Sequence, residues 1–544
     1  QALHNNTTGG YNSAVGQNCL ATNTTGAYNA AMGQGALFAN TTADNNTAFG
    51  VSALQSNTTG ASNTAVGRSA LLNNTTATGN VAVGANALDA CTTSPSNVCV
   101  GNNAGGSITT GNGENVCVGN GAAANMTTGQ QNIFIGDNCA AGAAVTGNVN
   151  TIIGDNAGYD LTTGAANTGL GANSLANITT GNYNTAIGYQ AMENNTTSDD
   201  SIAIGYRALY TGSALTQQLA IGNQAGYNTT GSDNVFIGHE CAYTNTTGNS
   251  NVAIGHRAFR ANTTGSSNTA VGLGALASNT TAGNCVAIGK NALNDNTTAS
   301  RNVAVGTGCQ QLTTTGTDNT AVGDAALGSN TTGYHCTAMG RVALLSNTTA
   351  GDNTAVGYAA LQLNTTGGQN TAIGKNAGQA ITTGSNNTLV GYQAGTSSSP
   401  ASMVTGSNTV VLGNNSVTSF ACKVSLTTGS DRRDKSDITP FTHGLSWIKK
   451  LNPVTYRWDM RCDYSDDLSI VPDGTHKKEK LDIGLIVQEE LEIEKEHGFG
   501  SDRNNMLIVN EDDVGSYSLK YERLVPVLIN AIKELSARLD AAGL

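Results

Sequence analysis

The sequence predicts a mainly β protein: a trimeric parallel β-solenoid (β-roll) of about 24 coils with a 17-residue repeat, then a small α+β domain that ends in a helix. Three observations support this fold class. A glycine preceded by apolar residues recurs at nearly constant spacing over most of the chain. The composition changes sharply after residue 426. Apolar residues in the final stretch have helical spacing.

Each repeat reads approximately N-T-A-V-G-x-x-A-L-x-x-N-T-T-G-x-x, and its core glycine recurs from Gly16 to Gly413. The residue before that glycine is apolar, as in Val15, and the residue two before it is small or apolar. Because adjacent side chains of a strand point to opposite faces, this short strand is predicted to be buried on both faces. A second apolar pair, such as Ala53-Leu54, and the Asn-Thr-Thr segments complete the coil. One coil is therefore predicted to hold two short strands and two turns.

The two apolar faces of the strand predict an oligomer. One face can fill the interior of its own coil, and the other needs a different partner. The simplest partner is a copy of the same chain around a symmetry axis. We therefore expect a parallel homotrimer.

The repeats resemble two groups of known proteins. The segment SIAIG at 201–205 is similar to the head repeats of trimeric autotransporter adhesins. The longer pattern NTAVG…AL…NTTG more closely resembles arrays attached to phage and large-virus fibre proteins. This resemblance covers most of the chain, and it implies a fibre shaft at a virion surface or outside the cell.

Some residues of the repeats are candidates for binding. Asn-Thr-Thr triplets such as 6–8 and 57–59 match the N-glycosylation acceptor pattern. The same residues suit a turn in which Asn bends the chain and Thr fills the bend. His239 and His256 follow successive core glycines and are expected to stack in one column. Two ligands are too few for a metal site, so no metal is expected there.

Tyrosines and cysteines of the repeats also have alternative interpretations. Tyr189, Tyr206 and Tyr358 are expected either to cap the coil surface or to form an exposed ladder that contacts glycans. The eleven cysteines include no C-x-x-C pair. Cys99 and Cys117 occupy positions where other repeats have alanine, so buried small thiols are expected.

Composition excludes several function classes. The net charge of −12 argues against a nucleic-acid partner, because phosphate binding requires basic patches. No apolar stretch of about 18 residues is present, so no membrane span is expected. No insertion in the repeats is long enough to form a catalytic pocket, and no cofactor is expected. Residues 1–3 match the second half of a coil, so we expect a preceding segment that anchors the chain to a larger particle.

A separate domain is predicted over residues 427–544, after a shaft of residues 1–426. Residues 430–544 carry 38 of the 62 charged residues and both tryptophans. Near the end of the chain, apolar residues lie on one helical stripe, which suits an oligomeric bundle or a short coiled coil. The stripe consists of Leu524, Leu528, Ile532, Leu535 and Leu539.

The junction between shaft and domain holds the segment TTGSDRRDKSDITP, residues 427–440. Ser430 and Lys435 lie five residues apart. A serine hydroxyl becomes a nucleophile when a base removes its proton, and a lysine can be that base if burial lowers its pKa. The alternative interpretation is a charged linker without chemistry. Arg432 and Arg433 are expected to form salt bridges or to be solvated.

The C-terminal domain resembles the intramolecular chaperone auto-processing domain of phage tailspikes and tail fibres, the endosialidase type. Four segments carry the resemblance in the right order: SDRRDKSDI, LNPVTYRW, IGLIVQEEL and YERLVPVLINAIKEL. It implies a domain that trimerises, assists the folding of the preceding fibre and then cuts itself off. It also implies that Ser430 is the nucleophile, Lys435 the general base and Gly429–Ser430 the scissile bond.

The sequence thus predicts a fibre shaft for host attachment whose C-terminal domain is a single-turnover serine autoprotease. A host-surface glycan or receptor is the expected partner. The alternative is a cell-surface adhesin or extracellular filament with an inactive C-terminal trimerisation clamp. An enzyme acting on glycans is disfavoured, because no repeat contains the acidic pair that glycoside hydrolysis requires.

Overall fold

The structure, a computed structural model, describes residues 1–399, 402–421, 423, 430–461, 464, 469–511 and 515–543. Two compact units are distinguished, residues 1–318 and residues 319–544. Each unit is described by itself. The predicted domain boundary at 426–427 lies outside the described residues and stays a prediction.

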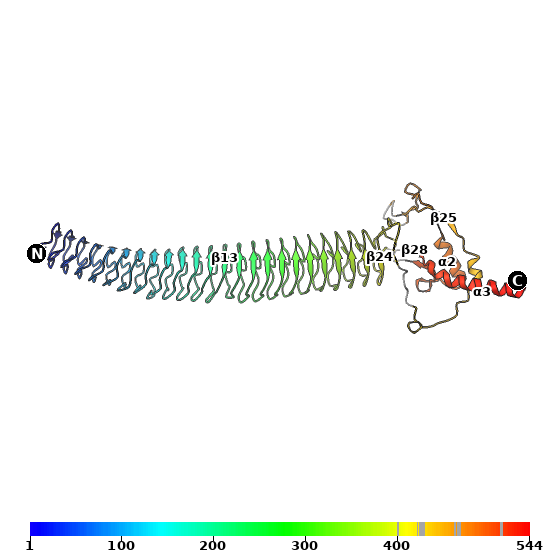
Figure 1. The fold of residues 1–544 in the computed structure, drawn as a ribbon, viewed down its shortest axis with the longest axis horizontal. Coiled ribbons are helices and arrows are strands. Elements are labelled where there is room, and N and C mark those ends of the chain that lie inside the picture. Colours follow the sequence, from blue (N-terminus) through cyan, green and yellow to red (C-terminus); the bar gives the residue numbers. More distant parts are fainter. Residues whose placement is uncertain are drawn as a thin grey trace. The chain divides into compact units, whose positions relative to one another are not determined.

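The first unit is a stack of coils, each with one strand of three residues (Figure 1). Each strand pairs in parallel with the same positions of the next coil, as Ala14 does with Ala31. The strands of this unit are β1 (Ser13–Val15), β2 (Ala30–Met32), β3 (Thr47–Phe49), β4 (Thr64–Val66), β5 (Val81–Val83), β6 (Val98–Val100), β7 (Val116–Val118), β8 (Ile133–Ile135), β9 (Thr151–Ile153), β10 (Thr168–Leu170), β11 (Thr185–Ile187), β12 (Ile202–Ile204), β13 (Leu219–Ile221), β14 (Val235–Ile237), β15 (Val252–Ile254), β16 (Thr269–Val271), β17 (Val286–Ile288) and β18 (Val303–Val305).

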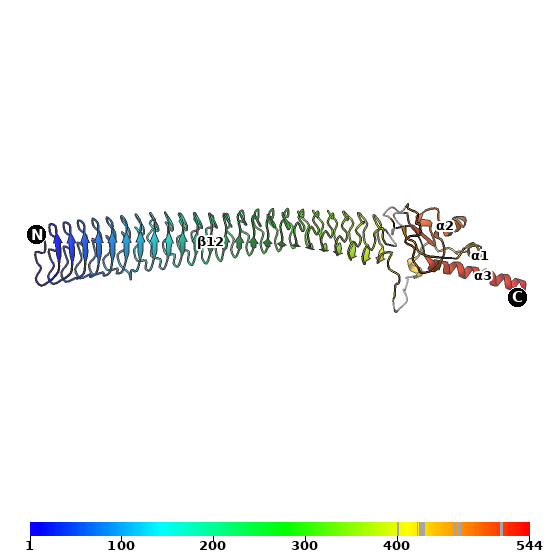
Figure 2. The ribbon, with the colours of Figure 1, turned by 90° about the horizontal axis from the view of Figure 1, so that it is seen from above.

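The predicted parallel solenoid is confirmed, but the prediction of two strands per coil was wrong. Outside its three-residue strand, the coil is built from turns (Figure 2). In the coil after Gly50, the backbone φ is +63° at Ser52, +51° at Leu54 and +60° at Ser62. A strand requires φ near −120°, so the Ala-Leu segment cannot be one. Burial of the leucine side chain offsets the cost of its left-handed backbone.

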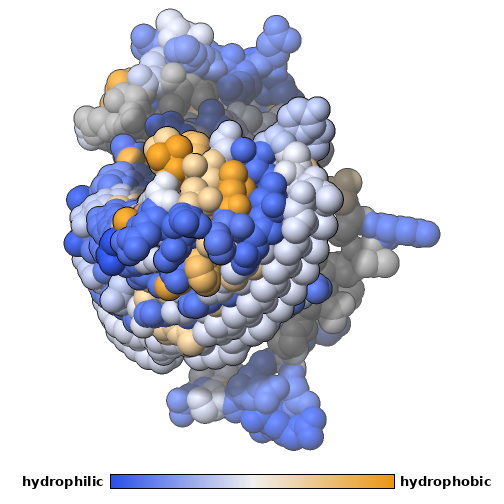
Figure 3. Space-filling model, turned by 90° about the vertical axis from the view of Figure 1, so that its left-hand side faces the viewer, coloured by the Kyte–Doolittle hydropathy of each residue, from blue (hydrophilic) through white to orange (hydrophobic). Residues whose placement is uncertain are grey.

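The interior of the coil is narrow and mostly aliphatic. The central residue of each strand points inward, and it is usually alanine. The Ala-Leu pair of the turn, such as Ala53-Leu54, is also fully buried. At the end of the stack that faces the viewer in Figure 3, apolar side chains lie among hydrophilic ones.

The core glycine is required by the close approach of neighbouring coils. Gly50 has φ +144°, and a Cβ there would lie 2.3 Å from the carbonyl oxygen of Gly67 in the next coil. Any side chain would therefore push the two coils apart. This contact explains why the glycine recurs with every coil.

Buried asparagines link each coil to the next. The Nδ2 of Asn57 donates to Asn40 Oδ1 and to the carbonyl oxygen of Gly60, both at 2.9 Å. Its own Oδ1 accepts from Asn74 Nδ2 at 2.7 Å. Asn57 is fully buried, and its amide is engaged on both sides. At residues 57–59, the geometry therefore supports the turn interpretation of the Asn-Thr-Thr segment.

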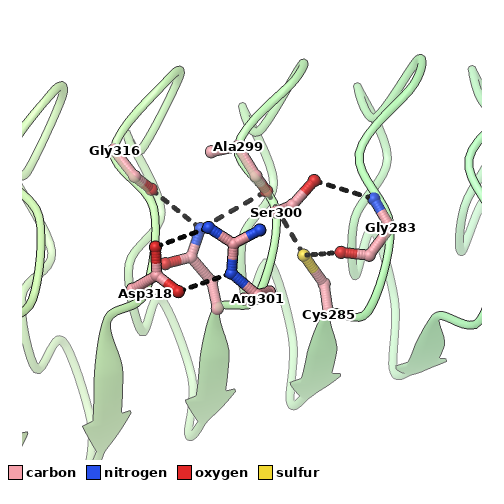
Figure 4. A network of polar contacts seen from close by, with 8 residues as sticks. Gly283, Cys285, Ala299, Ser300, Arg301, Gly316 and Asp318 are labelled. Carbon is pink, nitrogen blue, oxygen red and sulfur yellow. Dashed lines mark hydrogen bonds and ion pairs between the residues drawn. The ribbon is translucent and has the colours of Figure 1, made fainter.

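Other side chains add bonds between coils, as Figure 4 shows for the end of this unit. Arg301 forms a two-fold ion pair with Asp318 of the next coil, at 2.6 and 2.8 Å. In the same region the Cys285 thiol donates to the carbonyl oxygen of Ala299. All nine cysteines among the described residues are buried thiols outside disulfides, as predicted. Burial raises the pKa of the Cys91 thiol to about 11, so this thiol is unreactive at neutral pH.

The outward face of the strands is apolar and exposed in the single chain. The residue before each core glycine points out of the coil, and the exposed fraction is 61% for Val15 and 47% for Leu170. The column continues through Met32, Phe49, Ile254 and Ile288 in the first unit. The prediction of burial on both strand faces therefore holds for one face within a single chain, and the other face is uncovered.

The second unit continues the same coil pattern and then changes. Its solenoid strands are β19 (Thr320–Val322), β20 (Thr337–Met339), β21 (Thr354–Val356), β22 (Thr371–Ile373), β23 (Thr388–Val390) and β24 (Val410–Leu412). The region after residue 430 is α+β. Its elements are η1 (Arg432–Asp434), α1 (Leu445–Ile448), β25 (Val454–Tyr456), β26 (Asp482–Gly484), α2 (Val487–Glu496), η3 (Arg503–Asn505), β27 (Val509–Glu511), β28 (Tyr517–Leu519), η4 (Tyr521–Arg523) and α3 (Leu524–Ala542).

A small core holds the α+β region together. Strands β25 and β26 pair antiparallel, as do β27 and β28. The core is formed by Trp447, Ile493, Ile508, Leu524 and Val527. Helix α1 can lie close to α3 because residue 444, just before α1, is glycine. A Cβ at this position would be only 2.5 Å from the backbone nitrogen of Ala531 in α3. The predicted C-terminal helix is confirmed.

Two carboxylates of α2 are buried in this core. Glu494 accepts three backbone N–H groups, including that of Val509 at 2.8 Å. Glu490 Oε1 accepts from Trp447 Nε1 at 2.9 Å, and its Oε2 is buried without a hydrogen-bond partner among the described residues. Burial raises the pKa of Glu490 to about 7. The hydrogen bond from Trp447 lowers this pKa, and the charge of Glu494 raises it further.

We expect Asn57→Ala to destabilise its own coil and the two adjacent ones. The change leaves Asn40 Oδ1, Asn74 Nδ2 and the Gly60 carbonyl without this partner, at about 1–3 kcal/mol for each buried unpaired group. Hydrogen–deuterium exchange of the full chain should show faster exchange in residues 40–77 than elsewhere. Thr59→Ala is the control, because the Thr59 side chain is exposed. Equal exchange in both variants would contradict a structural role for the asparagine column.

We expect Glu490→Gln to stabilise the α+β region at pH 8 and not at pH 4.5. The folded-state pKa near 7 lies above the ordinary value of 4.5, so the wild type loses stability as pH rises between these values, by about 3 kcal/mol in all. Urea unfolding followed by tryptophan fluorescence at both pH values measures this difference. Glu489→Gln, at an exposed neighbour, should leave the pH dependence unchanged.

Candidate functional site

Ser430 and Lys435 come together at the start of the α+β region. Lys435 Nζ donates to Ser430 Oγ at 2.6 Å and lies 3.4 Å from the carbonyl oxygen of the same serine. The two predicted site residues are therefore within hydrogen-bond distance of each other. The third, Gly429, lies outside the described residues, so the geometry of the Gly429–Ser430 bond is not described.

A single 3₁₀ turn, η1, sets this distance. Asp431 caps the turn, and its carboxylate accepts from the backbone N–H of Arg433 at 2.8 Å. The chain then bends back, and the Lys435 N–H donates to the carbonyl oxygen of Arg432 at 3.3 Å. Arg433 forms an ion pair with Asp431 at 2.7 Å, as the sequence predicted for this arginine. Side chains five residues apart can thus meet without help from the rest of the domain.

The surroundings of the pair are open to water in the single chain. Ser430 and Lys435 are both exposed, as is every residue from 430 to 440. A lysine acts as a general base only in its neutral form, and burial is the usual means of favouring that form. The single chain therefore supplies the distance that a serine–lysine pair needs, and it leaves the pair solvated.

The apolar stripe of α3 is the second feature with functional potential. Leu528, Ile532, Leu535 and Leu539 are exposed, and Ile532 reaches 67%. They form an uncovered face of the helix together with Val525 and Ile529. Leu524 differs from the prediction, because it packs in the core of its own domain. The helix turns one side to this core, and position 524 lies on that side.

The candidate binding residues of the coils are arranged as columns. His239 and His256 stack with ring centroids 5.1 Å apart, which confirms the predicted column. Tyr189 and Tyr206 also stack, at 5.9 Å, and both are exposed. Among the described residues, no group of three or more His, Cys, Asp or Glu side chains is placed to hold a metal ion.

Sequence reasoning missed two features. One is the buried pair of Glu490 and Trp447, which lie 43 residues apart without any spacing signal. The other is a tyrosine row at Tyr210, Tyr227 and Tyr243. These tyrosines all occupy the fifth position after a core glycine, so alignment of the repeats by column could have identified them.

The described part of the chain contains no helix with both the length and the apolarity that a membrane span requires.

Comparison with known proteins gives one match. The sequence profile of the family described as chaperone of endosialidase matches residues 430–499, which include Ser430, Lys435 and the whole of helix α2. No curated protein and no solved structure matches the chain. The chain thus carries an endosialidase-chaperone segment after a long parallel β-solenoid, and this combination fits a tail-fibre protein of the endosialidase type.

Proposed function

We propose that this chain forms the trimeric shaft of a fibre, at a virion or other extracellular surface, that attaches to a host. Its C-terminal domain, residues 427–544, directs trimeric folding and then cuts the chain at Gly429–Ser430. The observation that carries this proposal is the 2.6 Å contact between Lys435 Nζ and Ser430 Oγ, inside the segment that matches the chaperone family.

The proposed cleavage step uses Ser430 as the nucleophile and Lys435 as the base. Ser430 Oγ attacks the carbonyl carbon of Gly429, and the neutral amine of Lys435 takes the hydroxyl proton. The bond from that carbon to the Ser430 nitrogen breaks, and Lys435 returns the proton to the nitrogen. An ester then joins Gly429 to Ser430 Oγ. One water molecule hydrolyses the ester, which leaves a Gly429 carboxylate and a Ser430 amine. Each chain reacts once, because its own backbone is the substrate.

Assembly into a trimer supplies what the single chain lacks. The exposed stripe of α3 and the outward column of the strands are apolar surfaces without a partner in one chain. Packing of three copies covers these surfaces, as expected for large apolar patches. It also removes water from the junction, which favours the neutral lysine. Cleavage then follows assembly and does not precede it.

We expect Ser430→Ala to abolish cleavage and Lys435→Met to slow it by about 100-fold or more. Intact mass under denaturing conditions should show a fragment of residues 430–544 from the wild type and only full-length chain from Ser430→Ala. Arg432→Ala is the matched control within the same turn, and it should cleave like the wild type. Full-length wild type after complete folding would refute the autoprotease, and it would favour the adhesin or filament with a retained clamp.

We expect Ile532→Asp to prevent trimer formation. The substitution places three carboxylates in the helix interface, and burying unpaired charges should weaken assembly by more than about 10-fold. Native mass spectrometry should show three chains for the wild type and single chains for this variant. Ala537→Asp adds the same charge on another exposed face of α3, and it should leave the trimer intact. A trimeric Ile532→Asp variant would exclude the α3 stripe as the interface.

A further inference from the structure

The many copies of one coil separate side chains that the fold requires from side chains that it does not. Interior columns repeat alanine, leucine and asparagine along the stack. The residues at the first, second and fifth positions after the core glycine vary from coil to coil. In the coils around β13, which is labelled in Figure 1, these positions carry tyrosine, histidine and arginine. The fold does not demand these residues, so another role is expected for them.

The tyrosine–arginine face consists of Arg207, Tyr210, Tyr227, Tyr243, Arg257 and Arg260, all in the first unit. Its tyrosine rings stack along the solenoid, with centroids 4.9 Å apart at both steps and planes within 9°. Arg207 lies 5.3 Å from the ring centre of Tyr210, and Arg260 lies 5.8 Å from that of Tyr243. A cation therefore closes the row at each end.

The arginines of this face are held in place. Arg207 Nε donates to Gln190 Oε1 at 2.6 Å. Arg257 Nε and Arg260 Nε both bond to Glu240 Oε2, at 2.9 and 3.0 Å. Each of these bonds uses Nε, and a guanidinium has further N–H donors on its terminal nitrogens. A ligand would meet fixed donors, so binding would cost little ordering of side chains.

The charge of the face differs from that of its surroundings. Residues 1–318 contain only six basic side chains against thirteen acidic ones. Half of the basic side chains, namely Arg207, Arg257 and Arg260, lie in this face. Glu240 pairs with two of them, and Glu193 is close enough to Arg207 for their charges to interact. Three arginines against these two carboxylates leave the face with a net positive charge on an acidic unit, which favours an anionic partner.

The stacking narrows the class of partner. The ring faces of the row are covered by one another and by the arginines, so a ligand meets ring edges, phenol hydroxyls and guanidinium N–H groups. Hydroxyls and carboxylates match these groups better than the apolar side chains that form the centre of a protein interface. The face repeats along the stack with the spacing of the coils, and a ligand with its own linear repeat can bind several coils at once.

We propose that the tyrosine–arginine face binds an acidic polysaccharide that lies along the solenoid. The arginines pair with the carboxylates of the polymer, and the row of tyrosine hydroxyls bonds to its hydroxyl groups. The proposal deepens the host attachment proposed above and rests on it, because it names the site and the chemical class of the receptor. It does not depend on cleavage at Gly429–Ser430.

The test uses the full chain and three probes on a biosensor: hyaluronan, alginate and the neutral polymer dextran. We expect binding to at least one of the acidic polymers, weakening at higher salt, and no binding to dextran. Arg207→Gln with Arg260→Gln should weaken binding by at least about 10-fold, since two charge-assisted contacts are lost. Tyr28→Ala is the control, because Tyr28 stacks on Tyr11 at 5.0 Å in a row outside this face. It should bind like the wild type.

Several results would overturn the proposal. They are a lack of binding to both acidic polymers, binding by the double arginine variant that equals binding by the wild type, and binding to a protein of the host surface but to neither acidic polymer. Intact and native mass of the same samples report cleavage and trimer formation separately. A folded, cleaved trimer that binds neither acidic polymer would refute the proposed binding by this face, and the proposed fibre function would be unaffected.

Discussion

The repeated contact between one coil and the next is the constraint on which the rest of the structure depends. Glycines meet backbone to backbone at the end of each strand, and a Cβ would not fit between them. Buried asparagines such as Asn57 bond to their counterparts one coil away and to the nearby turn. A shift of register would break every one of these bonds at once. These contacts fix the register of one coil against the next.

This constraint moves function to the outside and to the end of the chain. The interior columns are fixed by packing, so only outward positions are free to carry tyrosine, arginine or histidine. At the same time, parallel stacking leaves an apolar column on the outer face of the strands. Long-range pairing of this kind folds slowly and can slip in register. A chaperone domain that sets stoichiometry and register before the coils form would meet this need, and residues 430–499 match a family described as chaperone of endosialidase.

The sequence predicts the features that repeat, and it misses those that depend on contacts remote in the chain. The solenoid, its 17-residue coil and the buried cysteines follow from the spacing of glycine and apolar residues. The second strand was wrongly predicted because the pattern Ala-Leu looks the same in a strand and in a turn where Leu54 has φ +51°. Leu524 has the helical spacing of its neighbours, and only the position of α1 and the core decides that it points inward. The contact between Ser430 and Lys435 could be predicted because one short turn joins them, whereas the contact between Glu490 and Trp447 could not.

The serine–lysine pair lies in the sequence between the last solenoid strand, β24, and the α+β region. Its distance is set locally by η1, so it can form as soon as the junction is synthesised. Its reactivity needs a neutral lysine, and the exposed single chain does not supply the burial that favours one. In the proposed mechanism, the geometry of the pair is local and its desolvation comes from assembly, so the pair would stay idle during folding and react once three chains are in register. Cleavage would then occur only after folding is complete. Loss of the covalent link to the chaperone would then make the assembled shaft kinetically stable, because the element that nucleated folding is no longer attached.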